Sequence, residues 1–198
     1  MNLSKIKRLC LSEGKCLIVR DRHGGQWIGV EKALYPVIGL ELDQKSLCVI
    51  WQLTDKQAND LDFEERMDLE GFLDTGMVLD EGRPQVMDKA LINHIHFMGI
   101  ERDDGRVLMV NEELLAPAWV KGERSRYQLQ ETREGAVLMI FRGLMVSGVV
   151  KPAREGEARG MLEALASIAQ KGLVDVGEAK VWDKPETALE TENEQMEL

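Results

Sequence analysis

The residues whose type and spacing come nearest to a catalytic site are two histidines, His94 and His96. They belong to an apolar segment, 92–98, and on a β-strand this spacing would place both imidazoles on one face. Imidazoles so placed bind zinc or a non-haem metal when a carboxylate or a third histidine converges on them. Residues 92–98 hold no acid, so the carboxylate that we consider is Asp103. A half-buried polar strand face is the simpler interpretation, and the metal site is the alternative.

Adjacent carboxylates at Asp103 and Asp104 are explained by local structure. They precede Gly105, and Asp-Asp-Gly is typical of a turn, which accounts for the pair without a catalytic dyad. The chain also contains no glycine-rich phosphate-binding loop, no G-x-S-x-G and no H-E-x-x-H. These observations favour a protein that is not an enzyme and needs no cofactor.

The densest basic cluster consists of Lys5, Lys7 and Arg8. Apolar residues at helical spacing predict an amphipathic helix here, which ends at Gly14. The cluster is either a solvated helix face or a surface that contacts the phosphates of DNA without sequence specificity. The net charge of −10 argues against global attraction to nucleic acid, but it leaves room for a local basic face.

Composition indicates a globular protein of one or two domains. The 198 residues are 44% hydrophobic and 30% charged, and no apolar run approaches the roughly 20 residues of a membrane helix. The N-terminus lacks the pattern of a secretory signal. Cys10, Cys16 and Cys48 are odd in number and lack C-x-x-C spacing, which is typical of buried thiols in a reducing compartment. We therefore predict a cytoplasmic protein without membrane association.

The elements that would position such residues are clearest in residues 127–152. Three short apolar runs, separated by turns at Glu134-Gly135 and Arg142-Gly143, predict a meander of antiparallel strands. Pro152 lacks an amide donor and marks the end of the last strand. The predicted fold class is α+β, with antiparallel sheets and a few amphipathic helices.

The remaining elements are predicted from shorter patterns. Residues 16–19 and 26–30 predict a hairpin, and the run 33–38 contains Pro36, which suggests an edge strand. The apolar run 47–53 predicts a buried strand. A capping box at Thr54 begins a helix, and Asn111 caps a second short one. Acidic residues dominate 60–70, which predicts a solvated connection, and a further amphipathic helix follows the meander at 158–169.

Two segments share a common plan. IVRDRHGGQWIGVEKALYP (18–36) and GIERDDGRVLMVNEELLAP (99–117) each combine two apolar strands around a glycine turn with a following leucine and proline. This weak repeat favours two related halves. The predicted domains are an N-terminal α+β half (1–82), a C-terminal α+β half (83–182) and a disordered acidic tail (183–198).

The last strand of the meander runs into V-V-K-P-A-R (149–154), which resembles the V-V-M-P-M-R ending of the bacterial DNA polymerase sliding clamp. DDGRVLMVNEELLAPAW (103–119) is similar to a hairpin and short helix of a clamp domain. Lys151 and Ala153 depart from the motif, and the chain has room for two such domains instead of three. The resemblance implies a ring of several copies, helices that face DNA and a hydrophobic pocket for partner peptides.

Three functional hypotheses follow. The first is a non-catalytic binding or scaffold protein that associates with itself, with a clamp-like accessory role in DNA replication in a bacterium or mobile element. The second is a protein-interaction module whose meander accepts a partner strand at an exposed edge. The third is a small metal-dependent enzyme that uses His94 and His96.

Overall fold

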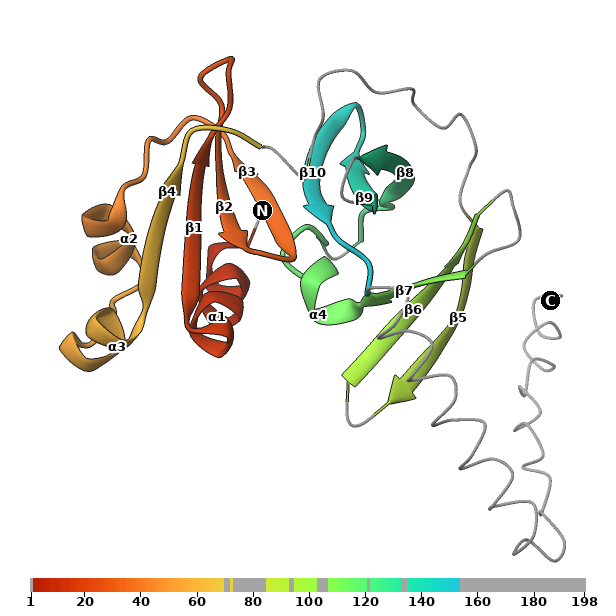
Figure 1. Cartoon of the computed structure of the whole chain (residues 1–198), viewed down its shortest axis with the longest axis horizontal. Helices are drawn as coiled ribbons and strands as arrows, with labels where there is room; N and C mark the ends of the chain where they lie inside the picture. The colour runs from red at the N-terminus through yellow and green to blue at the C-terminus, as the bar shows by residue number, and fades with distance from the viewer. Residues whose placement is uncertain are drawn as a thin grey trace, which may run out of the picture. The chain divides into compact units, whose positions relative to one another are not determined.

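The computed structural model describes residues 2–69, 72, 85–92, 95–102, 107–120, 122–132 and 135–153, with the backbone alone for 85–92. All of them belong to one compact unit, Met1–Leu162. The fold is α+β, as predicted: the described strands form a seven-stranded sheet in the order β4-β1-β2-β3-β10-β9-β8 and a three-stranded sheet in the order β5-β6-β7 (Figure 1).

The elements follow one another in the order helix, three strands, two helices, four strands, helix and three strands. They are α1 (Leu3–Glu13), β1 (Lys15–Arg20), β2 (Gln26–Val30), β3 (Ala33–Val37), α2 (Gln44–Ile50), α3 (Asp55–Asp60), β4 (Asp62–Arg66), β5 (Gln85–Ile92), β6 (Ile95–Glu101), β7 (Val107–Asn111), α4 (Glu112–Leu115), β8 (Arg126–Thr132), β9 (Gly135–Arg142) and β10 (Met145–Val150).

The predicted meander is confirmed as β8, β9 and β10, which pair antiparallel in sequence order. It joins the N-terminal strands because Val149 and Val150 of β10 pair with Leu34 and Ala33 of β3. The seven-stranded sheet therefore contains strands from both predicted segments, 1–82 and 83–182. The division into related halves and the tail at 183–198 stay predictions, and the helix at 158–169 lies outside the described residues.

The seven-stranded sheet buries residues on both faces. On β1, Cys16 and Ile18 belong to one buried cluster, whereas Leu17 and Val19 belong to another. This alternation is the period-two pattern of a strand covered on both sides. The predicted helix α1 packs on β1 and β2 and contributes Ile6, among other residues, to the first cluster.

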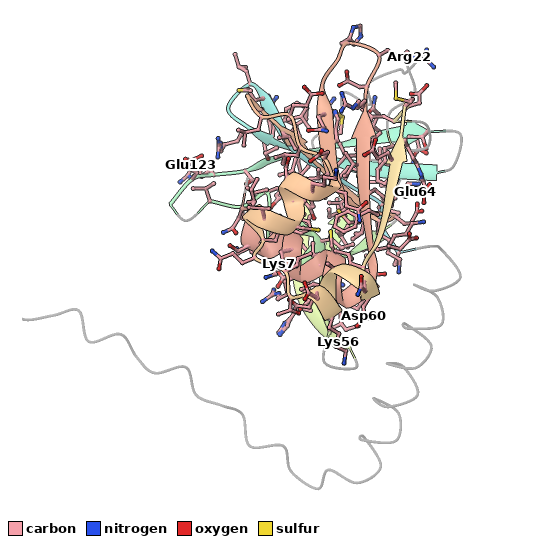
Figure 2. The ribbon with its side chains drawn as sticks, turned by 90° about the vertical axis from the view of Figure 1, so that its left-hand side faces the viewer. Lys7, Arg22, Lys56, Asp60, Glu64 and Glu123 are labelled. Atoms are coloured by element: carbon pink, nitrogen blue, oxygen red, sulfur yellow. The ribbon has the colours of Figure 1, made fainter. Side chains whose placement is uncertain are left out.

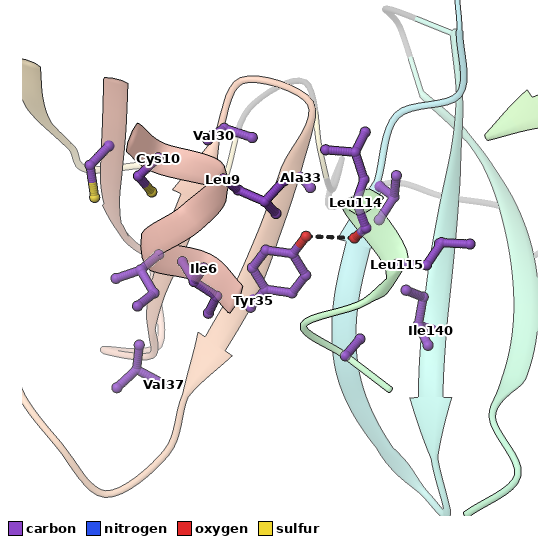
Figure 3. Packing of buried hydrophobic residues seen from close by; sticks show 14 of the residues in the cluster. Ile6, Leu9, Cys10, Val30, Ala33, Tyr35, Val37, Leu114, Leu115 and Ile140 are labelled. Atoms are coloured by element: carbon purple, nitrogen blue, oxygen red, sulfur yellow. Dashed lines mark hydrogen bonds between the residues drawn. The ribbon is translucent and has the colours of Figure 1, made fainter. Parts of the chain in front are cut away.

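A buried tyrosine links this sheet to α4. Tyr35 of β3 is fully buried, and its Oη donates a hydrogen bond of 2.5 Å to the carbonyl oxygen of Leu114 (Figure 3). Leu115 and Ala118 are buried in the same cluster. Tyr35 thus fixes the segment that leads from α4 toward β8.

The run 47–53 was predicted to be a strand, and that prediction is wrong. It lies in α2 and the turn that follows, and the side chain of Asp43 caps the helix by accepting from the amide of Ser46. Leu47 and Trp51 are buried while Val49 between them is 76% exposed. This is the pattern of one buried helix face, which a short apolar run does not distinguish from a strand.

The prediction of a solvated connection at 60–70 is also wrong for the part that is described, because residues 62–66 form β4, which pairs parallel with β1. One of its acidic side chains, Glu64, is paired with cations: Lys15 lies 2.5 Å from it, and Arg66 of the same strand contacts both Glu64 and Glu31 at 2.5 Å. Figure 2 shows Glu64 on this strand.

Pro36 does not mark an edge strand, because β3 lies between β2 and β10. The pairing of β3 with β10 is limited to Ala33 and Leu34, however, so Pro36 lies beyond it and needs no amide donor on that side.

The two segments of the proposed repeat share a hairpin and then diverge. β1 with β2 and β6 with β7 are both antiparallel pairs. After the second strand, the first segment continues into β3, whereas the second enters α4, which is capped by Asn111 as predicted. The capping box at Thr54 is also confirmed.

Candidate binding pocket

A surface pocket of about 440 Å³ lies where α1 meets the segment between α4 and β8. Its lining combines one lysine, two aromatic rings, a valine, a serine and a glutamate: Lys5, Trp119, Val120, Glu123, Ser125 and Tyr127. Its volume falls in the range of roughly 300–1,000 Å³ that is usual for small-molecule sites.

Two hydrogen bonds hold the first turn of α1 against the end of α4. The amide of Asn2, the N-cap residue of α1, donates to the carbonyl of Pro117 at 3.0 Å. Lys5 Nζ donates to the carbonyl of Ala116 at 3.0 Å, where a cation is favourable because the last carbonyls of a helix lack partners. The Lys5 ammonium has three N–H groups, so this bond leaves it able to contact an anion in the pocket.

The two aromatic side chains are joined to each other. Trp119 Nε1 donates to Tyr127 Oη at 2.9 Å, and both side chains are half-buried against the main core. The intervening chain turns at Gly122, whose φ of 87° favours glycine. The indole and phenol are therefore fixed in position, with part of each exposed to solvent.

Charge around the pocket is mixed. Exposed Arg124 precedes Ser125, which lines the pocket. Glu123, which projects from the loop before β8 in Figure 2, lies 3.4 Å from Nε of Arg142 and is thus partly neutralised. The guanidinium of Arg126 stacks on Phe141, 4.9 Å from the ring centroid.

The lining residues are suited to binding a ligand more than to catalysing a reaction. Among the described residues, the pocket lining holds no histidine and no cysteine, and its one carboxylate, Glu123, is paired with Arg142. An ammonium beside two flat rings instead favours a planar ligand that carries negative charge.

The predicted basic cluster is divided between two sides of α1. Lys5 lines the pocket, while Lys7 Nζ donates at 2.5 Å to the carbonyl of Trp51, at the end of α2. Residues two apart on a helix point about 200° away from each other, so Lys5 and Lys7 do not share a face. Arg8 is exposed and lies one turn from Lys5.

The aromatic residues of the pocket were not predicted. Trp119 and Tyr127 flank the basic sequence KGERSR (121–126), and such interleaving of aromatic and basic residues was the available signal. Their meeting with Lys5 depends on the contact between α1 and α4, which no local pattern specifies.

The metal site stays a prediction. His96 is exposed on β6, whereas His94 and Asp103 lie outside the described residues. Across the described part of the chain, no group of three histidine, cysteine, aspartate or glutamate side chains could hold a metal ion. Within the same residues, no helix is long and apolar enough to cross a membrane.

The resemblance to the sliding clamp, the cytoplasmic location and the self-association likewise stay predictions. Comparison of the chain with protein-family models, with curated proteins and with solved structures gave no match.

Proposed function

We propose that the protein is a non-catalytic binding protein that takes single-stranded nucleic acid at the pocket beside β8. The observation that carries the proposal is the fixed pair of half-exposed rings, Trp119 and Tyr127, next to the ammonium of Lys5. Bases stack on such rings whatever their sequence, and a cation contacts the adjoining phosphate. The function would then be accessory, in line with the role in DNA replication predicted from the sequence.

The net charge of −10 does not oppose this proposal at the pocket. Residues 183–198 hold six acidic side chains and one lysine, so half of the excess negative charge belongs to the last sixteen residues. Of the remaining acids, Glu31 and Glu64 are already paired with Lys15 and Arg66. At the pocket itself, Lys5 and Arg124 supply two positive charges against the one carboxylate of Glu123, which Arg142 partly neutralises, so local charge can favour a phosphate.

The test is a fluorescence anisotropy titration with a short labelled single-stranded oligonucleotide at several salt concentrations. Lys5 and Arg124 supply two phosphate contacts, so the slope of log K against log salt should be about −1.4. Trp119→Leu should weaken binding by roughly 5- to 150-fold, the equivalent of about 1–3 kcal/mol for one stacked base, and leave the slope unchanged. Lys5→Gln should reduce the slope by about 0.7.

The matched control is Lys45→Gln, which removes an exposed lysine of α2 outside the pocket and should leave both affinity and slope unchanged. Circular dichroism of each variant checks that the fold is retained. The proposal is contradicted if the wild type does not bind the oligonucleotide, or if Lys45→Gln weakens binding as much as Lys5→Gln. Binding of an acidic peptide in place of the oligonucleotide would assign the pocket to a protein partner.

A further inference from the structure

The pocket beside β8 contains two opposite charges that do not pair with each other. Lys5 donates to the carbonyl of Ala116, and Glu123 lies 3.4 Å from Nε of Arg142. Lys5 and Glu123 both line the pocket and are both described, yet no ion pair joins them. Each charge keeps a partner of its own, so a ligand that combines an anion with hydrogen-bond donors can contact both.

The carboxylate of Glu123 is able to accept further hydrogen bonds. Its contact with Arg142 uses Oε2, and the side chain is 51% exposed where it projects from the loop before β8 (Figure 2). A carboxylate has about four lone-pair sites on its two oxygens, so one cation leaves most of this capacity unused. Because a carboxylate repels phosphate, Glu123 faces the base of a bound strand and not its backbone.

The bases differ in what they present to a carboxylate. Guanine alone carries two adjacent N–H donors, N1–H and the N2 amino group, on its Watson–Crick edge. Adenine and cytosine each present one amino group beside a ring nitrogen that accepts, and thymine presents one N–H between two carbonyl oxygens. Those acceptors repel a carboxylate, so guanine is favoured by the donors that it has and by the acceptors that it lacks.

We infer that the pocket selects guanine among the bases of a single strand, with the carboxylate of Glu123 accepting from N1–H and from the N2 amino group. The inference rests on the proposed nucleic-acid binding and adds a base preference to it. Trp119 and Tyr127 are rings on which any base can stack, and Lys5 contacts the phosphate. Stacking therefore supplies affinity, and Glu123 supplies specificity.

The size of the preference follows from the exposure of Glu123. A bidentate contact between a side chain and a base discriminates against the wrong base by roughly 5- to 150-fold. Glu123 is half exposed, so water competes with guanine for its oxygens. We therefore expect the lower end of this range, about 5- to 10-fold.

The experiment compares short oligonucleotides with one central base, which is guanine, adenine, cytosine or thymine, while every other position is abasic. Only the central base can then stack in the pocket. Anisotropy titrations of the full chain should give the tightest binding for guanine. Glu123→Gln should abolish this preference, and adenine should bind at least as tightly as guanine, because the glutamine amide donates to N1 of adenine while its carbonyl accepts from N6.

The matched control is Glu65→Gln, which removes an exposed carboxylate of β4 outside the pocket and should keep the preference for guanine. Circular dichroism checks that both variants fold. Equal binding of the four oligonucleotides, or a preference for guanine that Glu123→Gln retains, would overturn the inference. In that case Trp119→Leu should still weaken binding of every oligonucleotide if the proposed function is correct, so the two failures are distinguishable.

Guanosine monophosphate and adenosine monophosphate, added as competitors, distinguish a strand from a free nucleotide. Weaker binding of guanosine monophosphate than of the central-guanine oligonucleotide supports selection of guanine within a strand. Equal binding of the two, with adenosine monophosphate weaker, would keep the selection of guanine but assign it to a free nucleotide, which contradicts the proposed function.

Discussion

Replacing Tyr35 by phenylalanine removes one oxygen from the centre of the fold and keeps the ring. In the wild type, Tyr35 is fully buried, Leu114 is 4% exposed, and the phenol donates to the Leu114 carbonyl at 2.5 Å. The variant loses a hydrogen bond with a net value of about 0.5–1.5 kcal/mol and leaves a buried carbonyl without this donor, which raises the cost toward about 3 kcal/mol. We expect the free energy of unfolding to fall by about 1–3 kcal/mol.

The assay is urea unfolding followed by circular dichroism, with Tyr127→Phe as the control. Tyr127 is only half-buried, so water can replace its bond with Trp119, and the loss should stay below about 1 kcal/mol. Equal losses in the two variants, or a loss below about 0.5 kcal/mol for Tyr35→Phe, would refute the reasoning that the Tyr35 bond stabilises the contact between β3 and α4.

The pH dependence gives a second readout of the same prediction. Burial raises the pKa of Tyr35 well above its ordinary value near 10. Above about pH 10 the unfolded chain releases the phenol proton while the folded chain retains it, so the stability of the wild type falls as pH rises. Tyr35→Phe lacks this proton, so the stability of the wild type should fall toward that of the variant above about pH 10.

Three further predictions concern the sheet and α1. Gly29→Ala should destabilise the fold by about 3 kcal/mol or more, seen as loss of soluble protein or a lower urea midpoint, because an added Cβ would lie 2.0 Å from the carbonyl oxygen of Ala33. Lys7→Met keeps the apolar stem but removes the hydrogen bond to the Trp51 carbonyl, and should lower the free energy of unfolding in urea by about 0.5–1 kcal/mol. An unchanged free energy would show that the ammonium does not stabilise the end of α2. Hydrogen bonds from Arg66, and then from Lys15, lower the pKa of Glu64 to about 2, so its contribution to stability is present above about pH 4.5 and is lost as pH falls toward 2. Glu64→Gln should flatten the acid side of the stability profile, and an unchanged profile would show that these ion pairs contribute nothing.

Elements whose signals are local were predicted correctly. The meander has turns that contain Gly135 and Gly143, both with positive φ, and α1 ends at Gly14 with a φ of 67°. A glycine in this conformation stops an element whatever the rest of the fold does. The capping box at Thr54 is also encoded within four residues, and the structure contains it.

The errors arose where tertiary contacts decide the structure. Residues 47–53 are apolar enough for a strand. Burial of Leu47 and Trp51 on one side instead favours a helix, which ends at Ile50 and is followed by a turn. The segment that forms β4 was predicted to be a charged connection because its stabilising partners, Lys15 and Glu31, come from distant parts of the sequence. The pocket could be predicted only in part, since Lys5 was singled out for its charge and its aromatic neighbours were not.

The central claim is that single-stranded nucleic acid stacks in the pocket beside β8, and photocrosslinking tests it most directly. An oligonucleotide that contains 5-iodouracil is irradiated with the protein, and the cross-linked peptide is identified by mass spectrometry. Because the base should stack on a pocket ring, we predict a cross-link to Trp119 or Tyr127 that Lys5→Gln weakens. A cross-link that maps outside the pocket, or none at concentrations where the oligonucleotide is bound, would contradict the account.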